Sequence, residues 1–84
     1  MMLPTIHRNG SHAATMLEDL MKTMSVLRAA IHHVQNIGPN GRDYYPQGPA
    51  AINIAMAEHE SRLERLESVH KELETLAEHI AHHA

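Results

Sequence analysis

Histidine is the side chain in this sequence with the most chemistry to offer, because nine of the 84 residues are histidines. An imidazole can ligate a metal ion, and it can change its charge near neutral pH. The sequence has no cysteine, which excludes thiolate metal sites and a disulfide framework. The informative histidines form two groups, one near residue 80 and one within an apolar pattern.

The first group has the spacing of a helical metal-binding pair. His79 and His83 are four residues apart, so both imidazoles would lie on one face of a helix, as in some zinc sites. If the chain folds back on itself, His7 or His12 would come close to this pair. A zinc site formed by His79, His83 and His7 is therefore one hypothesis. The alternative is that these side chains simply face solvent near a helix end.

The second group consists of His59 and His70, which occupy positions that the hydrophobic pattern assigns to a core. Burial disfavours the charged imidazole, so a fold that buries the neutral ring should lose stability as the pH falls toward about 6. Both residues are therefore candidates for pH sensing. The simpler interpretation is a half-buried histidine whose polar edge finds a hydrogen-bond partner.

The elements that must position these residues are two long helices. Apolar residues recur in steps of four and three in both halves of the sequence, which is the a and d spacing of a heptad repeat. In the first half these positions are Ala13, Leu17, Leu20, Met24, Leu27, Ile31 and Val34. In the second half they are Ile52, Met56, His59, Leu63, Leu66, His70, Leu73, Ala77 and Ile80. We expect helices at about residues 12–37 and 49–82, joined by a loop at 38–48.

Local signals predict where these helices begin and end. Gly38 precedes a proline and is expected to end the first helix in a left-handed conformation. The first helix has two candidate starts, Ser11 as the N-cap residue, or a capping box formed by Thr15 and Glu18. The second helix is expected to open at Pro49, since proline is well tolerated at the first helical position.

The heptads predict an antiparallel hairpin. When a positions face d positions, Leu17 lies opposite Leu73 and Leu27 lies opposite Leu63, which places the turn near residue 45. In this register His59 faces Ile31. The sequence thus predicts an all-α fold in which residues 12–84 form a single helical-hairpin domain, preceded by a flexible arm at residues 1–11.

The apolar stripe is wider than one hairpin needs, because the g positions are also largely apolar. We therefore expect two hairpins to form a homodimeric four-helix bundle. The expected self-association face consists of Leu17, Leu20, Met24, Leu27, Ile31, Leu63, Leu66, Val69, Leu73 and Leu76.

The loop holds the only two aromatic residues, Tyr44 and Tyr45. With Arg42, Asp43 and Gln47 they form a candidate partner-binding loop, since tyrosine and arginine are frequent at contact hot spots. The alternative is that the tyrosine rings cap the apolar end of the bundle, near Ile37 and Ile52.

Composition excludes several classes of function. Seven basic and ten acidic residues give a net charge of -3, without the basic stripe of a nucleic-acid binder. No segment approaches the roughly 20 apolar residues of a membrane span, and no nucleophile or phosphate-loop motif indicates an enzyme. We expect a cytoplasmic, non-catalytic protein–protein interaction module that scaffolds or regulates a partner. The alternative is a histidine-based zinc-binding protein.

Overall fold

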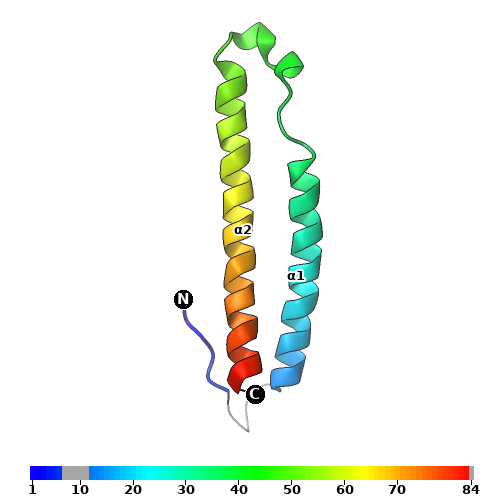
Figure 1. The fold of residues 1–84 in the computed structure, drawn as a ribbon, viewed down its shortest axis with the longest axis vertical. Helices are drawn as coiled ribbons and strands as arrows, with labels where there is room; N and C mark the ends of the chain where they lie inside the picture. Colours follow the sequence, from blue (N-terminus) through cyan, green and yellow to red (C-terminus); the bar gives the residue numbers. More distant parts are fainter. Residues whose placement is uncertain (7–11, 84) are drawn as a thin grey trace.

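The protein is a hairpin of two long antiparallel helices (Figure 1), described by a computed structural model for residues 1–6 and 12–83. Helix α1 spans Ala13–Gln35, and helix α2 spans Ala51–His83. The described residues include no strand. The predicted all-α hairpin is therefore confirmed, and the helix ends lie close to those expected.

The connection between the helices follows a defined path and covers residues 36–50. It contains two 3₁₀ helices, η1 at Gly41–Asp43 and η2 at Tyr45–Gln47. The side-chain oxygen of Asn40 accepts a hydrogen bond of 3.0 Å from the backbone N–H two residues later, which caps η1. Gly48 has a φ of 104°, a conformation that favours glycine because it lacks a Cβ.

Helix α1 begins without a side-chain cap. His12 is its N-cap residue, and the His12 side chain makes no capping hydrogen bond. The His12 carbonyl accepts a hydrogen bond of 3.0 Å from the backbone N–H of Thr15, so Thr15 lies within the first turn. The predicted capping box of Thr15 and Glu18 is therefore wrong, and Glu18 pairs instead with Lys22 at 3.0 Å. The other candidate cap, Ser11, lies outside the described residues.

The carboxyl end of α1 also differs from the prediction. The backbone N–H groups of Asn36 and Ile37 donate to carbonyl oxygens three residues earlier, at 3.0 and 3.2 Å, so the helix ends in a tightened turn. Gly38 does not adopt a positive φ, and the prediction of a left-handed Gly38 is wrong. The physical reason is Pro39. A proline disfavours helical backbone angles in the residue before it, so the backbone at Gly38 is more extended as the chain leaves the helix.

The two helices pair about one heptad away from the predicted register. Arg28 of α1 forms an ion pair with Glu67 of α2, with 3.1 Å between Nη1 and Oε1. Nη2 of Arg28 also lies 3.2 Å from Nδ1 of His70. Leu27 therefore faces the part of α2 near His70, whereas the prediction placed it opposite Leu63.

A one-heptad shift preserves the pairing of a with d positions, so the apolar pattern fits both registers. The observed register covers the carboxyl end of α2, where Ile80 is only 1% exposed. The predicted register would carry Ile80 past the start of α1. His59 accordingly lies beside Gly38 rather than Ile31, since a Cβ built on Gly38 would be 3.4 Å from the His59 Nε2.

Helix α2 extends past the carboxyl end of α1 (Figure 1), because α2 has 33 residues and α1 has 23. The connection continues in the direction of α1 beside these extra turns and reverses at the end of the rod (Figure 1), where η2 packs on α2. The molecule is a rod of 61 × 21 × 15 Å with a radius of gyration of 18.6 Å. A compact chain of this length would have a radius of gyration of about 12 Å. One layer of two helices therefore leaves the outer sides of both helices uncovered.

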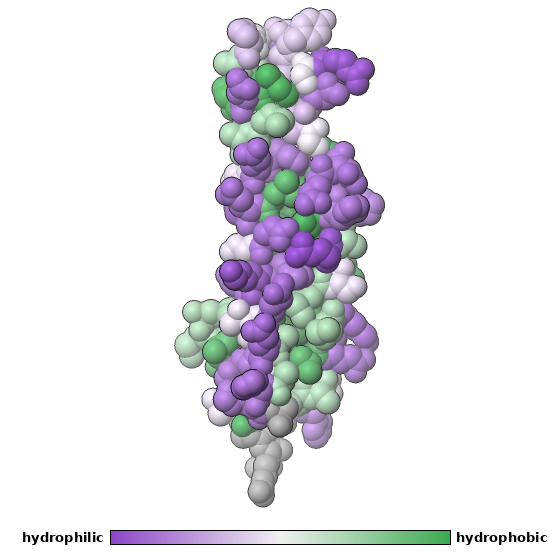
Figure 2. Space-filling model, viewed as in Figure 1, coloured by the Kyte–Doolittle hydropathy of each residue, from purple (hydrophilic) through white to green (hydrophobic). Residues whose placement is uncertain are grey.

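Few side chains are enclosed between the helices. Among the described residues, the buried side chains are Ile31, Ala55, His70, Ala77 and Ile80. Most other a and d residues are half-buried, and apolar side chains appear between polar ones along the rod in Figure 2. Of the described helices, neither is long and apolar enough to cross a membrane.

Residues 1–6 lie beside the carboxyl end of α2 (Figure 1). Nε2 of His79 lies 2.7 Å from the carbonyl oxygen of Pro4, a distance at which the ring N–H donates a hydrogen bond. Pro4 and Ile6 are half-buried. The flexible arm at residues 1–11 stays a prediction, and residues 7–11 lie outside the described part.

Candidate functional site

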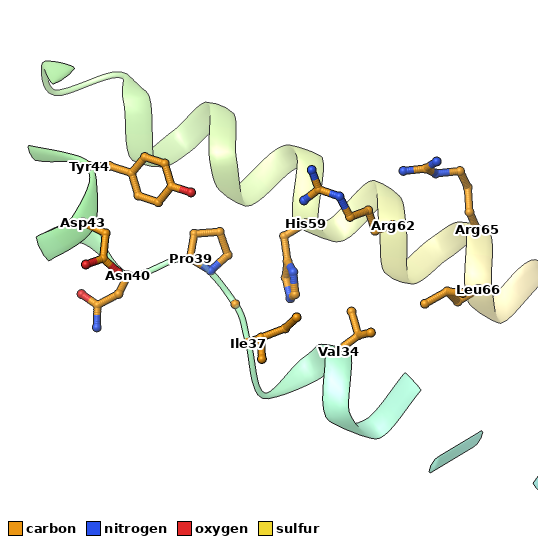
Figure 3. Close-up of a pocket in the computed structure, with 11 residues that line it drawn as sticks. Val34, Ile37, Pro39, Asn40, Asp43, Tyr44, His59, Arg62, Arg65 and Leu66 are labelled. Carbon is orange, nitrogen blue, oxygen red and sulfur yellow. The ribbon is translucent and has the colours of Figure 1, made fainter. Parts of the chain in front are cut away.

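A pocket of about 620 Å³ lies where α1 ends, between the connection and α2 (Figure 3). It forms because α2 continues past the end of α1, while the chain leaves α1 through residues 38–40. The lining residues are the apolar Val34, Ile37, Pro39 and Leu66, together with Gly38, Asn40, Asp43, Tyr44, His59, Arg62 and Arg65. We call this the joint pocket.

Two arginines stand on the α2 side of the joint pocket. Arg62 and Arg65 are three residues apart, so both guanidinium groups lie on the same side of the helix (Figure 3). Nε of Arg65 donates to the carbonyl oxygen of Ser61 at 3.2 Å. Arg62 has no hydrogen bond or ion pair with another described residue.

The connection supplies the opposite wall of the joint pocket. Asp43 and Asn40 lie at the end away from the arginines, and the hydroxyl of Tyr44 points toward the α2 wall (Figure 3). The pocket is therefore electrically polarised, with positive charge on the helix and negative charge on the connection.

The residues of the predicted partner-binding loop lie in two different environments. Asp43 and Tyr44 line the joint pocket, and Tyr44 is half-buried. Arg42 and Gln47 are exposed outside the pocket, and Tyr45 is 77% exposed. One ring thus faces the pocket and the other faces solvent. Ile37 remains 73% exposed despite sharing the pocket with Tyr44, so the alternative in which the tyrosine rings cap the apolar end is wrong at Ile37.

The terminal histidines lie together, as their spacing predicted. The ring centroids of His79 and His83 are 4.5 Å apart, and the rings are inclined at 46°. His79 already uses Nε2 in its bond to Pro4, and His7 lies outside the described residues. In residues 1–6 and 12–83, no group of three or more His, Cys, Asp or Glu side chains is arranged to hold a metal ion. The zinc site stays a prediction.

His70 lies in a polar network within the helix interface. Its Nδ1 is 2.8 Å from Oε1 of Glu74 and 3.2 Å from Nη2 of Arg28. One ring nitrogen cannot donate to the carboxylate and accept from the guanidinium at once, so the two contacts are alternatives. His59 is half-buried and lines the joint pocket. A pH-sensing role for either histidine stays a prediction.

The two sides of the hairpin differ in chemistry. In an antiparallel pair, the e positions of both helices lie on one side and the g positions on the other. Arg28, Glu67 and Glu74 occupy e positions, so charged side chains close that side. On the other side the g positions are mostly apolar or uncharged, with the exception of Arg62 near the end of the rod. A groove on α1 on this side is lined by Lys22, Thr23, Val26, Leu27 and Ala30.

We define the open face as the middle of this second side. It comprises Thr23, Val26 and Ala30 of α1 with Val69 and Leu76 of α2. Val26 is 71% exposed and Val69 is 48% exposed. Ile31, which the sequence assigned to self-association, is enclosed within the hairpin and unavailable to a second chain.

Sequence reasoning missed Arg62 and Arg65 as site residues. The predicted register placed His59 opposite Ile31, so nothing connected these arginines with the end of α1. The available signal was the spacing of His59, Arg62 and Leu66, which puts three pocket residues on one side of α2.

No family model matches the sequence, and no curated protein or solved structure is significantly similar to it.

Proposed function

We propose that this protein is a non-catalytic interaction module, in which two hairpins pair through the open face to form a four-helix bundle. The loop of Arg42, Asp43, Tyr44, Tyr45 and Gln47 then presents a surface to a partner protein, which the module scaffolds or regulates. The excess of exposed surface is the observation that carries this proposal.

The surface of a single chain is too large for its mass. The chain exposes 6503 Å². A compact monomer of this mass would expose about 5000 Å². The excess of about 1500 Å² is nearly twice the roughly 800 Å² that each partner buries in a standard interface. If a second copy covered this excess, each chain would bury at least as much surface as in a standard interface.

The open face has the chemistry that helix pairing requires. The small side chains of Thr23 and Ala30 allow another helix to approach closely, while Val26, Val69 and Leu76 supply apolar surface. None of the five carries a charge. On the opposite side, Arg28 and Glu67 would lose solvation if a second hairpin docked there.

The loop supports a recognition role because it combines an exposed aromatic ring with a fixed backbone. Tyr45 is 77% exposed and lies in η2, which packs on α2. A large side chain held on an ordered segment loses little conformational entropy on binding.

The test is the solution mass of the untagged chain by light scattering over a range of concentrations. We expect a mass near twice 9.4 kDa for the natural sequence. Val69→Glu should give a monomer, because it places a charge in the centre of the open face. The matched control is Ser68→Glu, which adds the same charge at the neighbouring exposed position.

A monomer at every concentration would overturn the dimer. So would a Val69→Glu variant that remained dimeric, since the pairing would then use another face. Circular dichroism of both variants checks that each remains helical.

A further inference from the structure

We propose that the joint pocket binds a small molecule that carries one carboxylate on an apolar body. Arg62 and Arg65 hold the carboxylate, and the apolar body packs against Ile37, Pro39 and Leu66. This inference goes beyond the proposed function and does not depend on dimerisation.

The arginines provide the anion-binding part of the pocket. A guanidinium group presents a planar fork of N–H donors that matches a carboxylate, and it stays charged at any physiological pH. Arg62 has no partner among the described residues, so its donors are available to a ligand. Arg65 uses only Nε in its bond to Ser61, which leaves its terminal nitrogens available.

The charge balance of the lining favours a monoanion. Two arginines face one carboxylate, Asp43, which stands at the far end of the pocket (Figure 3). A single negative charge is therefore balanced near the arginines, while a dianionic phosphate would be repelled by Asp43. Phosphate sites also commonly use the backbone N–H groups at a helix N-terminus. The first residues of α2 do not line this pocket.

The remaining wall is suited to a hydrocarbon body. Ile37 is 73% exposed although it stands beside other apolar side chains, so a ligand would remove apolar surface from water there. The volume of about 620 Å³ falls within the range of small-molecule pockets, roughly 300–1000 Å³. The Tyr44 hydroxyl adds one polar contact on the connection side (Figure 3).

The test is a titration of the ¹⁵N-labelled chain followed by NMR, with octanoate as the probe. Two matched probes separate the contributions: 1-octanol has the same hydrocarbon chain without the charge, and inorganic phosphate has charge without the chain. We expect octanoate to shift the amide resonances of the pocket residues. Octanol should bind at least about ten-fold more weakly, since it lacks the hydrogen bonds that a charged carboxylate makes to the arginines. Phosphate should also bind more weakly, since it has no hydrocarbon chain to remove from water.

Variants then assign the binding to the named residues. Arg62→Gln should weaken octanoate binding about ten-fold. Ile37→Ser should weaken it independently, and both positions are exposed enough for the fold to tolerate the change. Arg42→Gln is the control, because this arginine lies on the same connection but outside the pocket.

The inference is overturned if octanol binds as tightly as octanoate, or if Arg62→Gln leaves octanoate binding unchanged. Shifts confined to the open face, or no binding at millimolar octanoate, would overturn it as well. These outcomes are independent of the solution mass, so the failure of this inference and that of the dimer can be told apart.

Discussion

His70 is a buried polar residue whose partners are all on the edge of the helix interface. Its side chain is 11% exposed, while the side chains of Glu74 and Arg28 are about half exposed. Removing the imidazole would leave both partners hydrated, and Arg28 would keep its ion pair with Glu67. The polar network therefore contributes little to the stability of the pairing.

We therefore predict that two substitutions of His70 change the free energy of unfolding in opposite directions. His70→Leu should raise the free energy of unfolding by about 1 kcal/mol, because an apolar side chain replaces a polar one in an apolar interface. His70→Ala should lower it by about 2 kcal/mol, since it leaves a cavity. Urea denaturation at one protein concentration measures both. Equal losses for the two variants would show that the contacts to Glu74 and Arg28 stabilise the fold.

At the level of the helices, the sequence predicts the elements well and their register poorly. The heptad positions define which side of each helix faces the other, and the structure confirms both helices. The register is ambiguous because the apolar pattern repeats every seven residues. The charges do not resolve it, since Glu60, Glu67 and Glu74 also recur every seven residues and Arg28 finds a glutamate in either register.

The same ambiguity limits the prediction of the site. Asp43 and Tyr44 were identified from residue type alone, and both line the joint pocket. Arg62 could not be assigned to it, because its position beside the end of α1 depends on the register. The end of α1 beside Gly38 and Pro39 is a second requirement for the pocket, and this part of the site was predicted to within two residues.

Cross-linking between introduced cysteines tests the register directly, because the natural sequence has no cysteine that would react as well. We expect the double variant Arg28→Cys with Glu67→Cys to be joined rapidly by a short bis-maleimide within one chain. The pair Arg28→Cys with Glu60→Cys is the matched control, because those positions would be neighbours only in the other register. Faster intrachain cross-linking of the control pair, measured by mass spectrometry, would contradict the observed register.

For the whole molecule, the proposed dimer links stability to protein concentration. A hundred-fold increase in concentration stabilises a dimer by about 2.7 kcal/mol, so the melting temperature should rise by roughly 5–10 °C. Differential scanning calorimetry at two concentrations measures the shift. The Val69→Glu variant should show no such dependence, and a concentration-independent melting temperature for the natural sequence would argue against association.

The unequal lengths of α1 and α2 make the two ends of the rod different, since only one end carries a joint pocket. The symmetry of the proposed dimer therefore sets its valency. A two-fold axis along the rod would place both pockets at the same end, where a ligand with two linked heads could occupy them together and gain avidity. An axis across the rod would place the pockets at opposite ends of a body about 61 Å long, where each is occupied separately.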